Sequence, residues 1–288
     1  MDQPEISDPV FLEAVAAMDA GNVPVLEQLL AQHPYLACKQ LDMPAEKYFR
    51  QPYLLYFIAD NPVRTGTRPV NITDIAAVII HTVQQHAPDT LQKQLNYTLS
   101  LVATSSTCRA CGVQLTLMDL LLDAGAIASG ALDALAHSNV TAAKHLLERG
   151  EALTLPVAAC LGLTGSVERL AAVADERVRE VALAAAAFYG QTDVISLLLK
   201  TGVDVNAFPH AKCHFHEHAT ALHQAVCSGS LDAVKMLIHA GARPDLRDQL
   251  YQGTPLGWAE YLQSEEQYDA AAKQQFARIA GYLRTIAK

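Results

Sequence analysis

The chain has 288 residues, of which 51% are hydrophobic and 18% are charged, and this balance excludes a mostly disordered chain. The net charge of −9, without any long basic run, argues against nucleic acid and anionic membranes as partners. No apolar run approaches the roughly 18 residues of a membrane span, and the acidic start lacks an apolar leader. We therefore expect a folded cytoplasmic protein whose six scattered cysteines are reduced.

Apolar residues recur at three- and four-residue spacing along almost the whole chain, which predicts an all-α fold. In the first quarter, residues 53–58 are predicted to be a packed helix, with an aromatic docking patch as the alternative. The polar loop 61–69 that follows holds Arg64 and Arg68. Two arginines can bind a carboxylate or phosphate, but the composition of this loop favours a solvated segment.

Cys108 and Cys111 form a single Cys-x-x-Cys motif. A zinc ribbon needs a second such pair, and a thioredoxin-like motif needs a strand that leads into a helix. Neither context is visible around these residues. The two cysteines, like the isolated Cys38, Cys160 and Cys227, are predicted to be ordinary core thiols.

A repeated pattern runs along the chain, in which a turn residue is followed eight positions later by an apolar residue of a second helix. Its instances are Gly21 and Leu29, Ser138 and Leu146, Gly165 and Val173, Gly190 and Leu198, and Gly229 and Leu237. Four apolar pairs are also followed three residues later by Gly125, Gly150, Gly202 or Gly241. Each of these glycines is expected to close a helix with a left-handed backbone.

The clearest unit begins with Thr-Ala-Leu-His at Thr220, and Thr-Pro-Leu-Gly-Trp-Ala begins 34 residues later at Thr254. This pattern resembles the ankyrin repeat, with its Thr-Pro-Leu-His-x-Ala motif and closing Gly-Ala. The resemblance is strongest in the second half of the chain. The chain also resembles cytosolic bacterial ankyrin-repeat proteins of unassigned function. The resemblance implies an all-α, ankyrin-type helical solenoid of about seven or eight units. It also implies that His223 hydrogen-bonds to backbone at a turn.

We expect a single solenoid over 1–288. Degenerate units fill 1–130, the best-matching units fill 131–259, and 260–288 form a helical C-terminal cap. The turn residues Ser138, Gly165 and Gly190 are 27 and 25 residues apart, which predicts shortened units. Gly190 and Gly229 are 39 apart, which predicts an enlarged finger, the loop between repeats, at 203–219.

The densest group of potential metal ligands lies in this finger and comprises Cys213, His214, His216 and His218. On an extended strand the three histidines would project to one side, and two of them could share a zinc ion. The alternative, which we favour, is a solvated finger with mobile neutral imidazoles. We therefore expect no cofactor, with zinc bound at 210–218 in a metal sensor or switch as the alternative.

The sequence holds no dinucleotide or phosphate-binding glycine motif, no His-Glu-x-x-His and no Gly-x-Ser-x-Gly, so we do not predict an enzyme. An enzyme with an unrecognised site is the remaining alternative. A solenoid predicts a module that binds a protein partner through its concave face and the enlarged finger. The candidate anchors are Phe208, His210, Phe215, Arg247, Tyr251 and Trp258, although Trp258 could be buried in the last repeat interface. The finger is expected to expose Phe208 and Phe215, and deletion of 209–215 is expected to leave stability unchanged.

Overall fold

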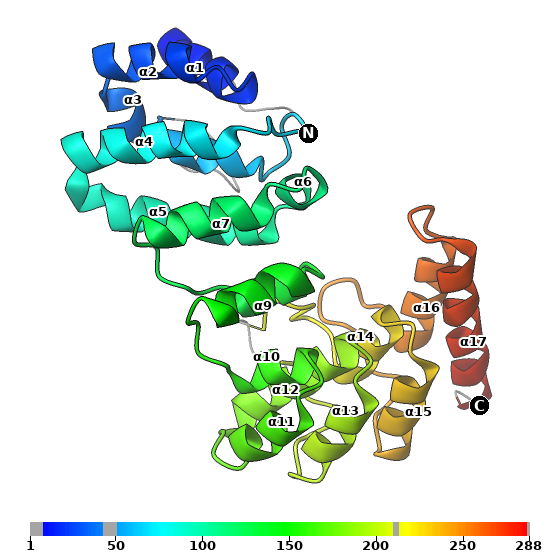
Figure 1. Cartoon of the computed structure of the whole chain (residues 1–288). Helices are drawn as coiled ribbons and strands as arrows, with labels where there is room; N and C mark the ends of the chain where they lie inside the picture. The colour runs from blue at the N-terminus through cyan, green and yellow to red at the C-terminus, as the bar shows by residue number, and fades with distance from the viewer. Residues whose placement is uncertain (1–7, 43–50, 210–212, 287–288) are drawn as a thin grey trace. The chain divides into compact units, whose positions relative to one another are not determined.

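The computed structural model describes residues 8–42, 51–209 and 213–286, and its regular elements over these ranges are all helical (Figure 1). The predicted all-α fold is therefore confirmed. Residue contacts divide the chain into two compact units, Met1–Glu151 and Ala152–Lys288, which we describe separately. The prediction of one continuous solenoid stays a prediction. Over the same described ranges, no helix combines the length and the apolar character needed to cross a membrane.

The helices of the first unit pack both on their neighbours in sequence and on helices farther along the chain. Its elements are α1 (Pro9–Asp19), α2 (Val23–Gln32), α3 (Tyr35–Cys38), the 3-10 helix η1 (Leu54–Ala59), α4 (Ile72–His86), α5 (Pro88–Thr104), α6 (Ser106–Ala110), α7 (Gln114–Asp123), α8 (Ala131–Ala136) and α9 (Val140–Glu148). Helix α1 packs on α2, α4 packs on α5 and η1, and α8 packs on α9. All six residues of η1 are buried, so the packed-helix prediction for 53–58 is correct and the docking-patch alternative is wrong.

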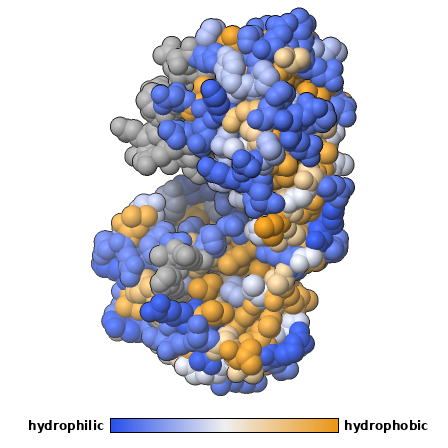
Figure 2. Space-filling model, turned by 90° about the vertical axis from the view of Figure 1, so that its left-hand side faces the viewer, coloured by the Kyte–Doolittle hydropathy of each residue, from blue (hydrophilic) through white to orange (hydrophobic). Residues whose placement is uncertain are grey.

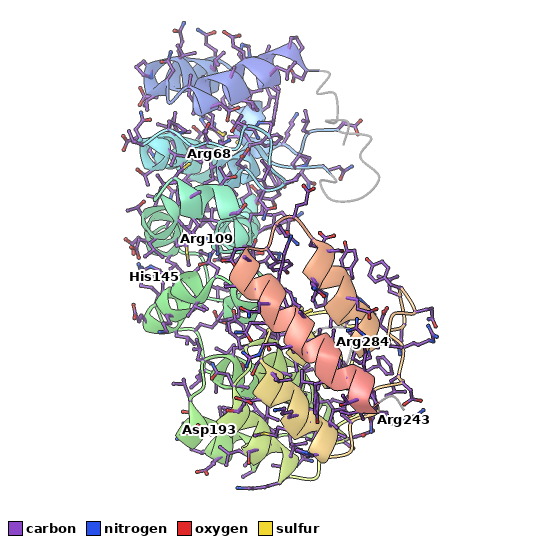
Figure 3. The ribbon with its side chains drawn as sticks, turned by 90° about the vertical axis from the view of Figure 1, so that its right-hand side faces the viewer. Arg68, Arg109, His145, Asp193, Arg243 and Arg284 are labelled. Atoms are coloured by element: carbon purple, nitrogen blue, oxygen red, sulfur yellow. The ribbon has the colours of Figure 1, made fainter. Side chains whose placement is uncertain are left out.

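The loop after η1 is exposed over most of its length, as predicted, but an ion-pair network around the buried Arg68 ties it to the unit. The Arg68 guanidinium, which has no exposed surface, donates to Asp60 at 2.9 Å and to Asp19 at 3.0 Å. Arg64 also pairs with Asp19. Asp60 in turn accepts hydrogen bonds from the backbone N–H groups of residues 64–66. The two arginines do bind carboxylates, but these carboxylates belong to Asp19 and Asp60 of the same chain. Figure 3 shows Arg68 within the first unit.

Of the two Cys-x-x-Cys thiols, Cys108 is a core group as predicted, whereas Cys111 is half-buried. Cys108 is buried, and its thiol donates to the carbonyl of Ala59 across a sulfur–oxygen distance of 3.4 Å. Burial raises the pKa of Cys108 to about 11, so the reactive thiolate is suppressed. The sulfur of Cys111 accepts a hydrogen bond from the backbone N–H of Arg68.

The second unit stacks four helix pairs. Its elements are α10 (Leu155–Cys160), α11 (Thr164–Ala171), α12 (Glu176–Phe188), α13 (Thr192–Leu199), α14 (Ala221–Cys227), α15 (Leu231–His239), α16 (Pro255–Ser264) and α17 (Ala270–Ile286). The first helices of the pairs, α10, α12, α14 and α16, form one packed row, and the second helices, α11, α13, α15 and α17, form another. The expected cap is thus made by α17, which packs on α15 and α16 and completes the last pair.

The glycine pattern predicted four helix ends correctly and placed one turn at the wrong residue. Gly125, Gly150, Gly202 and Gly241 have φ values of +110°, +104°, +79° and +96°, so each closes a helix in the left-handed region. Gly165 is not the turn of its repeat, because it lies inside α11 and Gly162, with φ of +70°, makes that turn. The apolar residue assigned to this turn, Val173, is 84% exposed. The unit lengths inferred from Gly165 are therefore wrong by three residues.

The two units differ in charge. Residues 1–151 hold 9 Lys and Arg against 16 Asp and Glu, whereas residues 152–288 hold 12 against 14. Most of the negative charge of the chain thus belongs to the first unit. In Figure 2, the lower part of the view, which carries the second unit, shows a gathering of hydrophobic residues.

Candidate functional site

Residues 213–219 of the enlarged finger do not project from the second unit but fold back over its first helices. We call residues 213–219 the folded finger. Phe215 is 7% exposed, and its ring centroid lies 5.0 Å from that of Phe188 in α12. The Nε2 of Gln224 in α14 donates to the carbonyl of His216 at 2.9 Å. The expectation that the finger exposes Phe215 is therefore wrong, because Phe188 supplies an aromatic surface one repeat earlier.

Three imidazoles of this region surround one indole. The ring centroids of His216, His218 and His223 lie 5.2, 5.8 and 5.0 Å from the Trp258 ring of α16. Burial lowers the pKa of His216, and the proximity of His218 adds to this effect. Trp258 itself is half-buried and donates its indole N–H to Asp248 at 3.0 Å. Trp258 therefore organises the folded finger, and only part of its surface is available to a partner.

The next finger, residues 243–253, is built around the buried carboxylate of Asp248. This carboxylate accepts hydrogen bonds from the backbone N–H groups of Leu250, Tyr251 and Gly253. Burial would raise the pKa of Asp248, but these bonds and the one from Trp258 hold it below its usual value. The backbone N–H of Gln249 donates to the carbonyl of His218 at 2.8 Å. The two fingers are thus joined, and the second is held in a fixed conformation.

The second finger and α16 together carry a group of large exposed side chains that we call the fingertip patch. It consists of Arg247, Leu250, Tyr251 and Tyr261. Leu250, Tyr251 and Tyr261 are 61%, 74% and 62% exposed. A hydrogen bond to Glu265 raises the pKa of Tyr261, and the charge of Tyr251 adds to the rise. The ring of Tyr251 rests edge-to-face on His218, with centroids 5.4 Å apart.

Arg247 is the exposed cation of this patch. Its Nη1 donates to the carbonyl of Gln252 at 2.7 Å, and it forms no ion pair with any residue that the structure describes. By contrast, Arg243 pairs with Asp245 and Arg284 pairs with Glu260, and both arginines are labelled in Figure 3. Arg247 therefore keeps donors available for a carboxylate on another molecule.

The four candidate metal ligands do not converge, so the described part of the chain gives the zinc alternative no support. The Cys213 thiol is buried and donates to the carbonyl of Phe215, and burial raises its pKa to about 11. His214 has φ of +62°, which breaks the extended path on which the alignment of the histidines depended. His216 and His218 pack against Trp258. In the described ranges, no group of three or more His, Cys, Asp or Glu residues could hold a metal ion.

The structure separates the remaining predicted anchors. Arg247 and Tyr251 are exposed, Phe208 and Trp258 are half-buried, Phe215 is buried, and His210 lies outside the described residues. Leu250 and Tyr261 were missed because their sequence spacing is equally compatible with packing inside the last repeat. The expectation that 209–215 can be deleted without cost loses its basis, since Pro209, Cys213 and Phe215 are all buried.

His223 has the role that the repeat motif implied. It is fully buried; its Nδ1 accepts from the backbone N–H of Thr220 at 3.3 Å, and its Nε2 lies 3.2 Å from the carbonyl oxygen of Gly253. Desolvation lowers the pKa of His223 to about 4. The imidazole is therefore neutral and connects α14 to the next finger.

The comparison with protein families agrees with the repeat fold of the second unit. Residues 155–248 match the family described as ankyrin repeats (3 copies). The matched region begins at the first helix of the second unit and includes the folded finger and Asp248. A comparison of the chain with curated proteins finds no match.

Proposed function

Because this chain is an ankyrin-repeat protein, with its repeats recognised over residues 155–248, we propose that its second unit binds a protein partner through the fingertip patch. Ankyrin repeats are generally protein–protein interaction modules. The observation that carries the proposal is the exposure of Leu250, Tyr251 and Tyr261 around an arginine without an ion-pair partner in the described chain. Monomeric proteins rarely expose such side chains together without a binding role.

The composition of the patch suits a binding surface. Tyrosine and arginine are the residue types that most often dominate the binding energy of an interface. Asp248 fixes the backbone on which Leu250 and Tyr251 stand, so little conformational entropy is lost when a partner binds. The partner segment that fits presents an apolar side chain to the two tyrosines and a carboxylate to Arg247.

A peptide-display selection against the full chain tests this proposal without a known partner. Peptides are selected on the wild-type protein, and their affinities are measured for Tyr251→Ala/Tyr261→Ala. We expect a loss of at least tenfold, about 1.4 kcal/mol. Val173→Ala is the matched control, because Val173 is an exposed apolar residue of the same unit outside both fingers.

The charge of the selected peptides provides the second readout. We expect enrichment of Asp and Glu on the wild-type protein, and loss of that enrichment on Arg247→Glu. Arg243→Glu is the control for charge alone, because Arg243 already pairs with Asp245 on the same finger. Selected peptides that bind the tyrosine and Arg247 variants as tightly as the wild type would contradict the proposal.

The alternatives receive less support. The metal sensor requires converging ligands, and Cys213, His214, His216 and His218 do not converge. The predictions that the chain is not an enzyme, that it binds no nucleic acid and that it is cytoplasmic stay predictions.

A further inference from the structure

The folded finger crosses three consecutive first helices of the second unit. Phe215 packs on Phe188 of α12, and the His216 carbonyl accepts from Gln224 of α14. The rings of His216 and His218 pack on Trp258 of α16. A short segment thus covers a surface made by three repeats, with an aromatic side chain at one end and a backbone carbonyl in the middle.

Two buried polar atoms, one in this segment and one in the helix beneath it, lack hydrogen-bond partners among the described residues. Gln224 is fully buried, yet its Oε1 has no hydrogen-bond partner among the described atoms, and the same is true of the buried Nε2 of His218. A buried polar group without a partner costs free energy, which weakens the closed arrangement. The Phe188 and Trp258 rings and the Gln224 amide thus form a surface on which the folded finger leaves the Gln224 Oε1 without a hydrogen bond.

We propose that the folded finger is an intramolecular ligand that covers a second protein-binding surface on α12, α14 and α16. The ligand that displaces the folded finger from this surface is an extended peptide segment of a partner protein, and this segment carries an aromatic side chain. The aromatic side chain replaces Phe215 on Phe188, and a backbone carbonyl replaces that of His216 on the Gln224 Nε2. A backbone N–H donated to the Gln224 Oε1 adds a hydrogen bond that the folded finger does not make.

Covalent attachment explains why the finger occupies the surface in the absence of a partner. A tethered segment competes at an effective concentration in the millimolar range, so even a weak fit keeps the surface covered. This inference rests on the proposed function, because the peptide segment that displaces the folded finger belongs to a partner protein. It requires neither Arg247 nor Tyr261 of the fingertip patch, whereas Tyr251 packs on His218 of the folded finger.

Native-state hydrogen exchange on the full chain tests whether the finger opens by itself. The reporters are the amide of Ala219, bonded to the His216 carbonyl, and the amide of Gln249, bonded to the His218 carbonyl. We expect both to exchange at least ten times faster, relative to their intrinsic rates, than the amide of Ser228 at the end of α14. Equal protection of all three would mean that the finger opens only when the unit unfolds, and would overturn the proposal.

A peptide added in trans tests whether the surface binds such a segment. The probe is a synthetic peptide with the sequence of residues 213–219 and serine in place of the cysteine. It should bind Phe215→Ala at least tenfold more tightly than the wild type, because the tethered competitor is weakened. The same peptide with Ala in place of its Phe should not bind.

Two further variants make the result specific. In the Phe215→Ala background, Arg247→Ala/Tyr261→Ala should leave peptide binding unchanged, which separates this surface from the fingertip patch. If Phe215→Ala does not fold, Gln224→Met removes the hydrogen bond to the finger, and it should accelerate exchange of the Ala219 amide at least fivefold in the folded chain. Peptide affinities that are equal for the wild type and Phe215→Ala, or an unchanged Ala219 amide in Gln224→Met, would overturn the proposal.

Discussion

The imidazole of His223 reaches from α14 to the carbonyl of Gly253 in the next finger, with its Nε2 3.2 Å from the carbonyl oxygen. Because Nδ1 accepts the backbone N–H of Thr220, Nε2 carries the ring proton and donates it to Gly253. One neutral side chain therefore caps its own helix and joins two successive repeats.

This arrangement predicts loss of stability in acid. Burial lowers the pKa of His223 to about 4 in the folded chain, whereas an unfolded histidine titrates near 6.5. The unfolded state therefore binds the proton first, and the contribution of His223, complete above pH 6.5, is lost as the pH falls towards 4. Urea unfolding between pH 7.5 and 4 measures it.

The control for this prediction is His223→Gln, which keeps a polar group and removes the titration. The stability difference between wild type and variant should shrink as the pH falls, because other acid-sensitive groups such as Asp60 and Asp248 are common to both. A difference that does not change with pH, or that grows in acid, would show that His223 is not buried in its neutral form.

A second prediction concerns Arg68 in the first unit. Its guanidinium and the carboxylate of Asp60 are both fully buried, so Arg68→Ala leaves a buried charge without its partner and should cost about 3–5 kcal/mol of unfolding free energy. Arg64 binds Asp19 near the surface, so Arg64→Ala should cost about 1 kcal/mol. Chemical denaturation measures the unfolding free energy of both variants. Equal losses of unfolding free energy would show that Arg68 is no more buried than Arg64.

A third prediction tests the helix-closing glycines. Gly202 and Gly241 have positive φ, and a Cβ at either position would meet no neighbouring atom within 4 Å. Replacement by Val should therefore cost about 1–2 kcal/mol through backbone strain alone. Gly165 lies within α11 in similarly open space, so Gly165→Ala should stabilise the chain by about 0.5–1 kcal/mol. Melting temperatures that fall for Gly165→Ala or stay unchanged for both Val variants would contradict these conformations.

The sequence predicted the parts of the fold that depend on local patterns. The repeat motif located α14, the role of His223 and the glycines that close the helices. The sequence did not predict the environment of Arg68, because the carboxylate of Asp19 lies 49 positions away in the chain. The spacing between Gly190 and Gly229 revealed an enlarged finger but not its direction. That direction depends on contacts with Phe188 and Trp258, and the spacing between turn residues carries no information about these contacts.

A hydrogen-exchange footprint of the full chain bound to a peptide from the display selection shows directly whether the fingertip patch is the binding surface. We expect protection of the amides of residues 247–262, with the same peptide leaving the amides of residues 53–104 unchanged. Protection confined to the first unit, with residues 247–262 unaffected, would contradict the assignment of protein binding to the fingertip patch.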